Sequence, residues 1–204
     1  MSQRLSTFAK LIFLMCMSFC IQAQDLFLKR DGSELGNRYG TMKNEPYAFK
    51  DWIIVDLTDR MGHEVKDVKI NYNGYTGELE TQVDEKIFAM DGFYYPRFVI
   101  KSTKAKYVYS ANTSGNYVRE MFNGERSALF TQFVAKLDEK GDRFNSETIS
   151  YIIKDRKTTT ITKENDLLKV LNDEKASAFA KSNKINPNDM NQACILLAYM
   201  EKNN

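Results

Sequence analysis

Apolar and polar residues alternate through the middle of the chain, and this pattern predicts β-strands. In the segment 68–72 apolar residues alternate with Lys69 and Asn71, which is the period of a half-buried strand. The segment 78–83 repeats the alternation, and Asn73-Gly74 between the two segments is a strong hairpin-turn signal. Similar strand-like segments with turn signals between them are 52–57, 86–90, 98–100, 107–109, 117–118, 129–137, 148–154 and 158–162. Many short strands at close spacing predict an antiparallel sheet, arranged as a sandwich or a partial barrel.

The period of the apolar residues changes near residue 163 from that of a strand to that of a helix. The segment 167–171 predicts a short amphipathic helix, with Thr162 or Asn165 as its N-cap. Alanines and a phenylalanine at helical spacing predict a second helix from about Asp173 to Asn183. We therefore expect strands first and helices last.

A third helix is expected after Pro187, which breaks the chain. Asn188 or Asp189 can cap it, and the apolar residues that follow recur at three- and four-residue spacing. The predicted fold class is α+β, with an antiparallel β-rich region at 24–162. The region 163–204 supplies two or three C-terminal helices that pack on the sheet.

The first two dozen residues have the three parts of a secretory signal peptide. Arg4 and Lys10 give a basic start, 11–19 is an apolar run broken only by a serine, and Ala23 stands at the expected cleavage position. A membrane-spanning helix needs about 20 apolar residues, so this run is too short to anchor the chain. We expect residues 1–23 to be removed and the remainder, without a transmembrane segment, to work in the periplasm or outside the cell.

Cysteine placement fits export of a disulfide-free protein. Cys16 and Cys20 fall within the leader, so only Cys194 remains and no internal disulfide can form. Cys194 stands among apolar residues and is expected to be a small core residue. Lipid attachment at Cys20 is an alternative, although the bulky Phe19 stands where a small residue precedes a lipidated cysteine.

The charge balance argues against a nucleic-acid partner. The chain has 29 lysines and arginines and 27 acidic residues, and loss of Arg4 and Lys10 with the leader would leave 27 of each. Nucleic-acid binding normally needs a basic surplus that displaces counterions from phosphates. We therefore expect no nucleic acid among the partners.

Several short motifs place the chain beside other exported proteins. The segment 68–80 has an NY-x-x-Y-x-x-x-L core and is followed by the strand-like 86–90, while 151–154 and 166–171 form a last hairpin strand and an LL-x-x-L helix. With these motifs the chain resembles a diffuse group of small exported Bacteroidota proteins, most of them of uncharacterised function. The resemblance extends over residues 50–202. It implies no activity and assigns no site residue.

Candidate chemistry along the chain is sparse. The one histidine, His63, follows the turn signal Met61-Gly62, and a single histidine beside Glu64 is too little for a metal site of three or four ligands. We expect His63 to be a surface turn residue. The segment 138–142 resembles part of a calcium loop, but it lacks the alternating ligands and the final glutamate of an EF-hand, which favours a tight hairpin turn. No metal or cofactor is predicted.

The aromatic cluster Phe93-Tyr94-Tyr95 is the candidate binding site. Three successive aromatic residues in a strand cannot all face one core, because neighbouring side chains point to opposite faces. At least one is expected on the opposite face or in a loop, where exposed rings stack on sugars or anchor partners. The alternative is a two-sided sheet whose second face is covered by the helices.

The predicted function is binding rather than catalysis. Export, a charge near zero, an aromatic content of 12% and the lack of a catalytic motif favour a non-enzymatic protein that binds an envelope protein or a surface glycan. The alternative is an envelope hydrolase that uses paired carboxylates. A chaperone-like assembly factor is a further alternative and would need a broad exposed apolar groove.

Overall fold

The computed structural model describes residues 39–203 apart from 85, 102–105, 113 and 165. The signal peptide expected at 1–23, its cleavage after Ala23 and the lipid alternative at Cys20 lie outside the described residues. In the part of the chain that is described, the helices are too short or too polar to cross a membrane.

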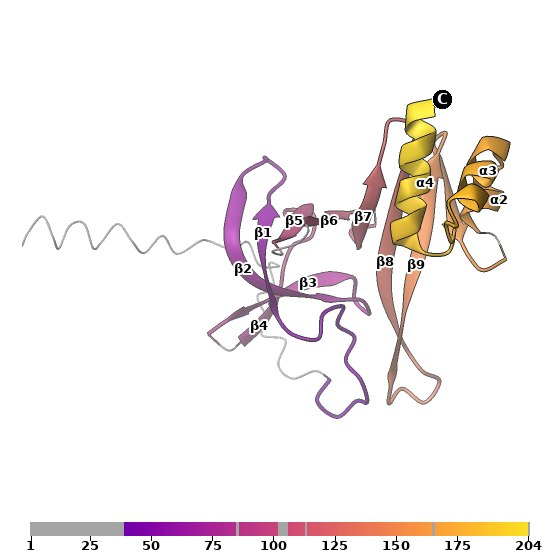
Figure 1. Cartoon of the computed structure of the whole chain (residues 1–204). Coiled ribbons are helices and arrows are strands. Elements are labelled where there is room, and N and C mark those ends of the chain that lie inside the picture. Colours follow the sequence, from indigo (N-terminus) through magenta and orange to yellow (C-terminus); the bar gives the residue numbers. More distant parts are fainter. Residues whose placement is uncertain (1–38, 85, 102–105, 113, 165, 204) are drawn as a thin grey trace, which may run out of the picture.

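Within the described residues, ten antiparallel strands form one open sheet that is followed by three helices, which confirms the α+β class (Figure 1). The strands are β1 (Ile53–Thr58), β2 (Glu64–Asn73), β3 (Glu78–Val83), β4 (Lys86–Ala89), β5 (Arg97–Lys101), β6 (Lys106–Ala111), β7 (Tyr117–Asn123), β8 (Ser127–Leu137), β9 (Phe144–Lys154) and β10 (Lys157–Ile161). Each strand falls on a segment whose alternation or β-branched residues predict one.

The strand order is β10-β9-β8-β7-β6-β5-β1-β2-β3-β4. The first four strands form a meander in one direction, and the chain then returns so that β5 pairs with the other side of β1. From β5 to β10 the strands again follow one another. All the strands belong to a single sheet, as in a partial barrel, rather than to the two separate sheets of a sandwich.

The sheet bends until the turn after β2 touches β8. The carbonyl oxygen of Gly74 accepts a hydrogen bond from the Ala135 N–H at 3.0 Å, and the Gly74 N–H donates to the Pro46 carbonyl at 2.8 Å. A Cβ atom on Gly74 would lie 2.5 Å from the ring of Phe133, so only glycine permits this approach. The bend encloses the first core cluster, whose buried residues are Val55, Leu57, Val68, Ile70, Tyr72, Leu79, Met90, Tyr95, Phe98 and Tyr117.

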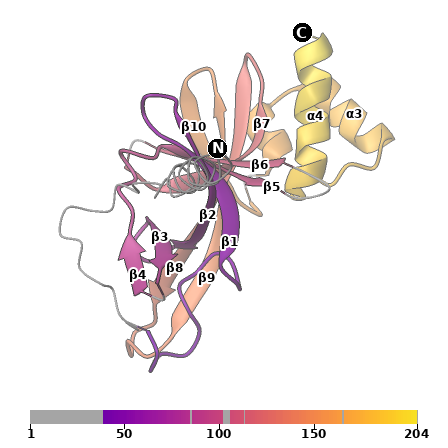
Figure 2. The same cartoon turned by 90° about the vertical axis from the view of Figure 1, so that its left-hand side faces the viewer.

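Three helices cover one face of the last strands (Figures 1 and 2). They are α2 (Leu167–Leu171), α3 (Glu174–Ser182) and α4 (Met190–Asn203). Their apolar sides form a second core cluster with Leu129 of β8 and Ile152 of β9. The change from strand to helix therefore comes between the end of β10 and the start of α2.

Aspartates cap the helices. The side chain of Asp166 accepts a hydrogen bond from a peptide N–H in the first turn of α2, so the prediction of Thr162 or Asn165 as its N-cap is wrong. Asp166 stands immediately before the first helical residue, where a cap must lie. Asp173 caps α3, and Asp189 accepts from the first N–H groups of α4, as predicted.

Glu201 attaches the end of α4 to the sheet. Its carboxylate accepts hydrogen bonds from the peptide N–H groups of Arg126 at 3.1 Å and Ser127 at 3.2 Å in the turn between β7 and β8. Burial acts to raise the pKa of Glu201, but these hydrogen bonds outweigh it and hold the pKa below its usual value. Cys194, also on α4, is half-buried, and its thiol contacts the Met121 carbonyl of β7 at 3.2 Å.

Removing the hydroxyl group of two core tyrosines should have different effects on stability. Tyr72 is 2% exposed, and within the described residues its hydroxyl has no hydrogen-bond partner, whereas the Tyr117 hydroxyl donates to the Tyr95 carbonyl. Burial raises the pKa of Tyr72 to about 12, and the nearby Tyr117 N–H offsets part of that rise without reaching hydrogen-bond geometry. In urea unfolding, Tyr72→Phe should leave stability unchanged or raise it, and Tyr117→Phe should lower it by about 1–2 kcal/mol. A large loss in Tyr72→Phe would mean that a buried water satisfies this hydroxyl.

Candidate functional site

The face of the sheet opposite the helices carries a pair of aromatic side chains. Leu129 and Ile152 point into the core beneath the helices. Because neighbouring residues of a strand point to opposite faces, Phe130 and Tyr151 point away from that core. The two are directly paired across β8 and β9. None of the three described helices lies on this face (Figures 1 and 2).

The Phe130–Tyr151 pair lines an open groove of about 700 Å³. The ring centroids are 5.6 Å apart and the ring planes differ by 25°, so the two half-buried rings form a nearly continuous aromatic surface. Ile149 and Ile153 extend this surface along β9. The polar residues of the groove are Ser110, Asn112, Glu120, Asn123, Gln132, Thr158 and Thr160. The groove therefore combines an apolar surface with hydroxyl, amide and carboxylate groups around it.

Two polar groups of the groove are placed beside the aromatic pair by strand register. Glu120 on β7 is the direct cross-strand neighbour of Phe130, and the Ser110 hydroxyl of β6 donates a hydrogen bond to its carboxylate. Thr160 on the edge strand β10 is the cross-strand neighbour of Tyr151. Burial raises the pKa of Tyr151, so its hydroxyl stays protonated at neutral pH and can donate or accept a hydrogen bond. The five strands β6 to β10 thus present hydrogen-bonding groups to one surface.

The predicted cluster Phe93-Tyr94-Tyr95 lies in the turn between β4 and β5 and not in a strand. The Asp91 carboxylate accepts hydrogen bonds from the N–H groups of Phe93 and Tyr94, which forms a side-chain-stabilised turn and ends the strand. The expectation that at least one ring lies in a loop is confirmed. The rings separate, because Phe93 is 76% exposed, Tyr94 is half-buried and Tyr95 is 1% exposed in the core.

A second exposed apolar side chain, that of Met61, lies in the turn adjacent to that of Phe93. Met61, between β1 and β2, is 71% exposed, and the Arg60 N–H donates to the Tyr94 carbonyl at 2.9 Å, which holds the two turns together. The Arg60 guanidinium lies 5.7 Å from the centre of the Tyr94 ring. We call Met61, Phe93 and Tyr94 the turn surface.

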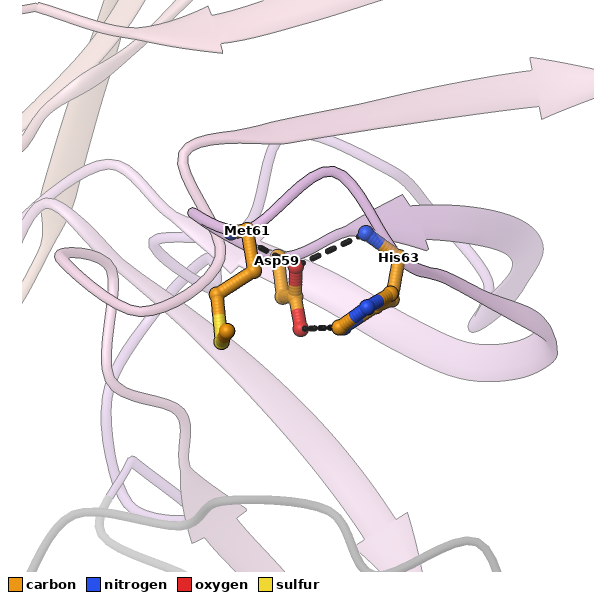
Figure 3. Close-up of polar contacts among 3 residues, drawn as sticks. All are labelled: Asp59, Met61 and His63. Carbon is orange, nitrogen blue, oxygen red and sulfur yellow. Dashed lines mark hydrogen bonds and ion pairs between the residues drawn. The ribbon is translucent and has the colours of Figure 1, made fainter.

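His63 belongs to the turn after β1, as predicted, and its side chain is exposed (Figure 3). The Asp59 carboxylate accepts hydrogen bonds from the peptide N–H groups of Met61 and His63, both at 2.8 Å, and lies 3.1 Å from His63 Nδ1. Burial acts to raise the pKa of Asp59, but the hydrogen bonds outweigh it and hold the pKa below its ordinary value of 3.8. The contacts between Asp59 and His63 thus stabilise the turn between β1 and β2.

This turn predicts an acid-sensitive contribution to stability. Because the folded-state pKa of Asp59 is depressed, its ionised form stabilises the fold above the unfolded pKa, and the contribution is lost as pH falls through the folded pKa. Unfolding in urea should show Asp59→Asn less stable than the unmodified chain at pH 7, and the difference should shrink below pH 3.8. A difference that stays constant down to pH 2 would contradict this role of the carboxylate.

The segment 138–142 forms the hairpin turn between β8 and β9, as predicted. The Asp138 carboxylate accepts a hydrogen bond from the Asp142 N–H at 3.2 Å. Burial acts to raise the pKa of Asp138, but hydrogen bonds from backbone N–H groups outweigh it and lower the pKa. Over residues 39–203 outside the gaps, no group of three or more His, Cys, Asp or Glu side chains could hold a metal ion.

Comparisons of the chain with protein-family models, with curated proteins and with solved structures found no match. The resemblance to exported Bacteroidota proteins therefore stays a prediction from the sequence. The functional interpretation rests on the geometry of the groove and of the turn surface.

Proposed function

We propose that the protein is a non-enzymatic binding protein that takes a short oligosaccharide in the groove. The observation that carries the proposal is the Phe130–Tyr151 pair, half-exposed on a sheet face and surrounded by hydroxyl and amide groups. A sugar ring has an apolar face of C–H groups, which stacks on aromatic rings, and a rim of hydroxyls that needs hydrogen-bond partners. The groove supplies both.

The size of the groove supports a small ligand. Its volume of about 700 Å³ lies within the range of small-molecule sites, roughly 300–1,000 Å³. The polar groups come from β6, β7, β8 and β10, so a ligand that spans the aromatic pair meets partners on both sides. The signal peptide predicted at 1–23 also supports the proposal, because an exported chain would encounter the glycans of the cell envelope.

Substitutions in the aromatic pair test the proposal. The chain from Gln24 onward, applied to a glycan array, should bind a defined set of oligosaccharides, and Phe130→Ala or Tyr151→Ala should each weaken that binding at least tenfold, or about 1.4 kcal/mol. Tyr151→Phe keeps the ring, so it should weaken glycan binding less than Tyr151→Ala does. Phe93→Ala, which is not among the residues that line the groove, should bind normally.

Retention of full glycan binding in the Phe130→Ala/Tyr151→Ala double variant would refute the groove as the site. Urea unfolding of each variant is needed beside the array, because both rings are half-buried. A folded double variant that does not bind is the supporting result.

The turn surface favours a second candidate, the binding of an envelope protein. Phe93 and Met61 are the most exposed large apolar side chains within the described residues, and an exposed aromatic ring is a common anchor of a protein interface. Pull-down with the folded chain should retain a partner that Phe93→Ala/Tyr94→Ala loses and Phe130→Ala keeps. Tyr95, in the core, is not part of this surface.

The hydrolase alternative has less support. A two-carboxylate mechanism needs two acids within about 10 Å of each other and a general acid with a raised pKa. The described lining of the groove has one carboxylate, that of Glu120. Asp138, in the separate turn between β8 and β9, has a lowered pKa, which suits a hydrogen-bond acceptor and not a general acid.

A further inference from the structure

The charge of the groove narrows the class of oligosaccharide. Glu120 is the one charged residue among the described residues that line it. The Ser110 hydroxyl donates to this carboxylate, and strand register sets it beside Phe130, so a ligand stacked on the aromatic pair lies next to a fixed negative charge. The groove therefore offers an acceptor for hydroxyl or ammonium groups.

Two nearby cations, Arg119 and Lys154, point away from this charge. Arg119 precedes Glu120 on β7 and points to the opposite face, where its guanidinium lies 4.2 Å from the centre of the Tyr107 ring. Lys154 follows Ile153 on β9 and likewise points to the helix side, where its ammonium group donates to the Leu171 carbonyl at 3.1 Å. The side chains that alternate with the groove residues thus carry their positive charge to the other side of the sheet.

Two cations elsewhere on the groove face, Arg97 on β5 beside Ser110 and Lys136 on β8, are not among the residues that line the groove. The Lys136 ammonium group is 2.9 Å from the carboxylate of Glu147 on β9. An acidic sugar bound on the aromatic pair would face Glu120, and the described residues that line the groove include no cation. Two like charges about 4 Å apart repel each other by roughly 1 kcal/mol in bulk water and more where water is partly excluded.

We propose that the groove selects neutral or amino-bearing oligosaccharides and rejects acidic ones, with Glu120 as the residue that discriminates. This inference rests on the proposed function of the groove. Glu120 can accept hydrogen bonds from sugar hydroxyls in a neutral ligand and can pair with the ammonium group of an amino sugar. The carboxylate or sulfate group of an acidic sugar makes neither contact with Glu120 and is repelled by its charge.

Tetrasaccharides of different charge test the selection. The probes are the N-acetylglucosamine tetramer, its deacetylated amino form and the galacturonic acid tetramer, each titrated calorimetrically into the chain from Gln24 onward. The unmodified protein should bind the amino form at least as tightly as the neutral one and the acidic form at least about tenfold more weakly. Glu120→Gln should reduce the ratio of amino to acidic affinity about tenfold, because it keeps the shape of the side chain and removes its charge. Glu147→Gln, outside the groove, should leave the ratio unchanged.

The results distinguish a failure of charge selection from a failure of the groove as a glycan site. Galacturonate binding as tight as that of the neutral tetramer, and lost in Phe130→Ala, would overturn charge selection while leaving the groove as a glycan site. An unchanged ratio in Glu120→Gln would also overturn it. Binding of none of these probes, together with a blank glycan array, would overturn the proposed function itself.

Discussion

Replacing Glu80 by alanine is expected to lower the free energy of unfolding by about 3 kcal/mol, because the buried Asn73 amide and the half-buried Tyr47 hydroxyl lose an acceptor. Glu80 is 1% exposed, and its carboxylate accepts the Tyr47 hydroxyl at 2.7 Å and the Asn73 side-chain amide at 2.8 Å. Each unsatisfied buried donor costs roughly 1–3 kcal/mol. Urea unfolding monitored by circular dichroism measures the loss.

The same network positions the segment that precedes β1. Asn73 Oδ1 accepts hydrogen bonds from the N–H groups of Tyr75 and Thr76 and so shapes the turn after β2, while its amide also donates to the Tyr39 hydroxyl. Burial and then the Glu80 carboxylate raise the pKa of Tyr47 well above its usual value, so its hydroxyl remains a donor at neutral pH. The loss of Glu80 should therefore also loosen residues 39–49.

A surface glutamate provides the matched control. Glu147 pairs with Lys136, but both side chains are more than half exposed, and such pairs contribute about 0–1 kcal/mol. Glu147→Ala should therefore change stability little. If Glu80→Ala were as mild as Glu147→Ala, the buried network would not be a determinant of stability.

Gly74→Ala is expected to destabilise the fold by about 3 kcal/mol, since the new methyl group has no room. Its Cβ would lie 2.5 Å from the Phe133 ring and 3.0 Å from the Ala135 nitrogen. The turn cannot easily retreat, because both the N–H and the carbonyl of Gly74 form hydrogen bonds. Thermal and urea unfolding measure the loss, and weakened protection of the Ala135 N–H in hydrogen exchange would show that β8 has moved away.

Gly62 is the control for a glycine substitution without a clash. It has a φ of +87°, and a Cβ there would meet nothing within 4 Å. Gly62→Ala should therefore cost only the strain of a left-handed conformation, about 1 kcal/mol. A Gly74→Ala loss no larger than that of Gly62→Ala would mean that the sheet adjusts its bend at little cost.

The strands and helices could be predicted because their signals are local. The alternation at Glu78–Val83 and the cap at Asp189 each depend on residues close in sequence, and both elements form where those signals place them. The bend of the sheet was not predictable in this way. It depends on Gly74 meeting Phe133, and no local pattern encodes a contact between residues so far apart.

The groove was missed for a related reason. Phe130 and Tyr151 form a pair only because β8 and β9 align them, and register is not visible in one strand alone. The sequence carries a signal that could have found it, since adjacent Leu129 and Phe130 are both large and apolar and require both faces of β8 to be occupied. The cluster Phe93-Tyr94-Tyr95 lies in a turn, where side chains follow no period, so which of its rings would be buried could not be inferred.

The position of β1 between β2 and β5 has a consequence for how the chain folds. Every other strand pair joins sequence neighbours, so the β1–β4 meander can form as soon as it is synthesised, and β5 must then dock on an edge that already exists. Until it does, the β1 edge displays unpaired backbone groups to any other nascent chain. A chain truncated before β5 should keep this edge of β1 permanently unpaired. Such chains should then associate with one another by pairing strands at the β1 edge.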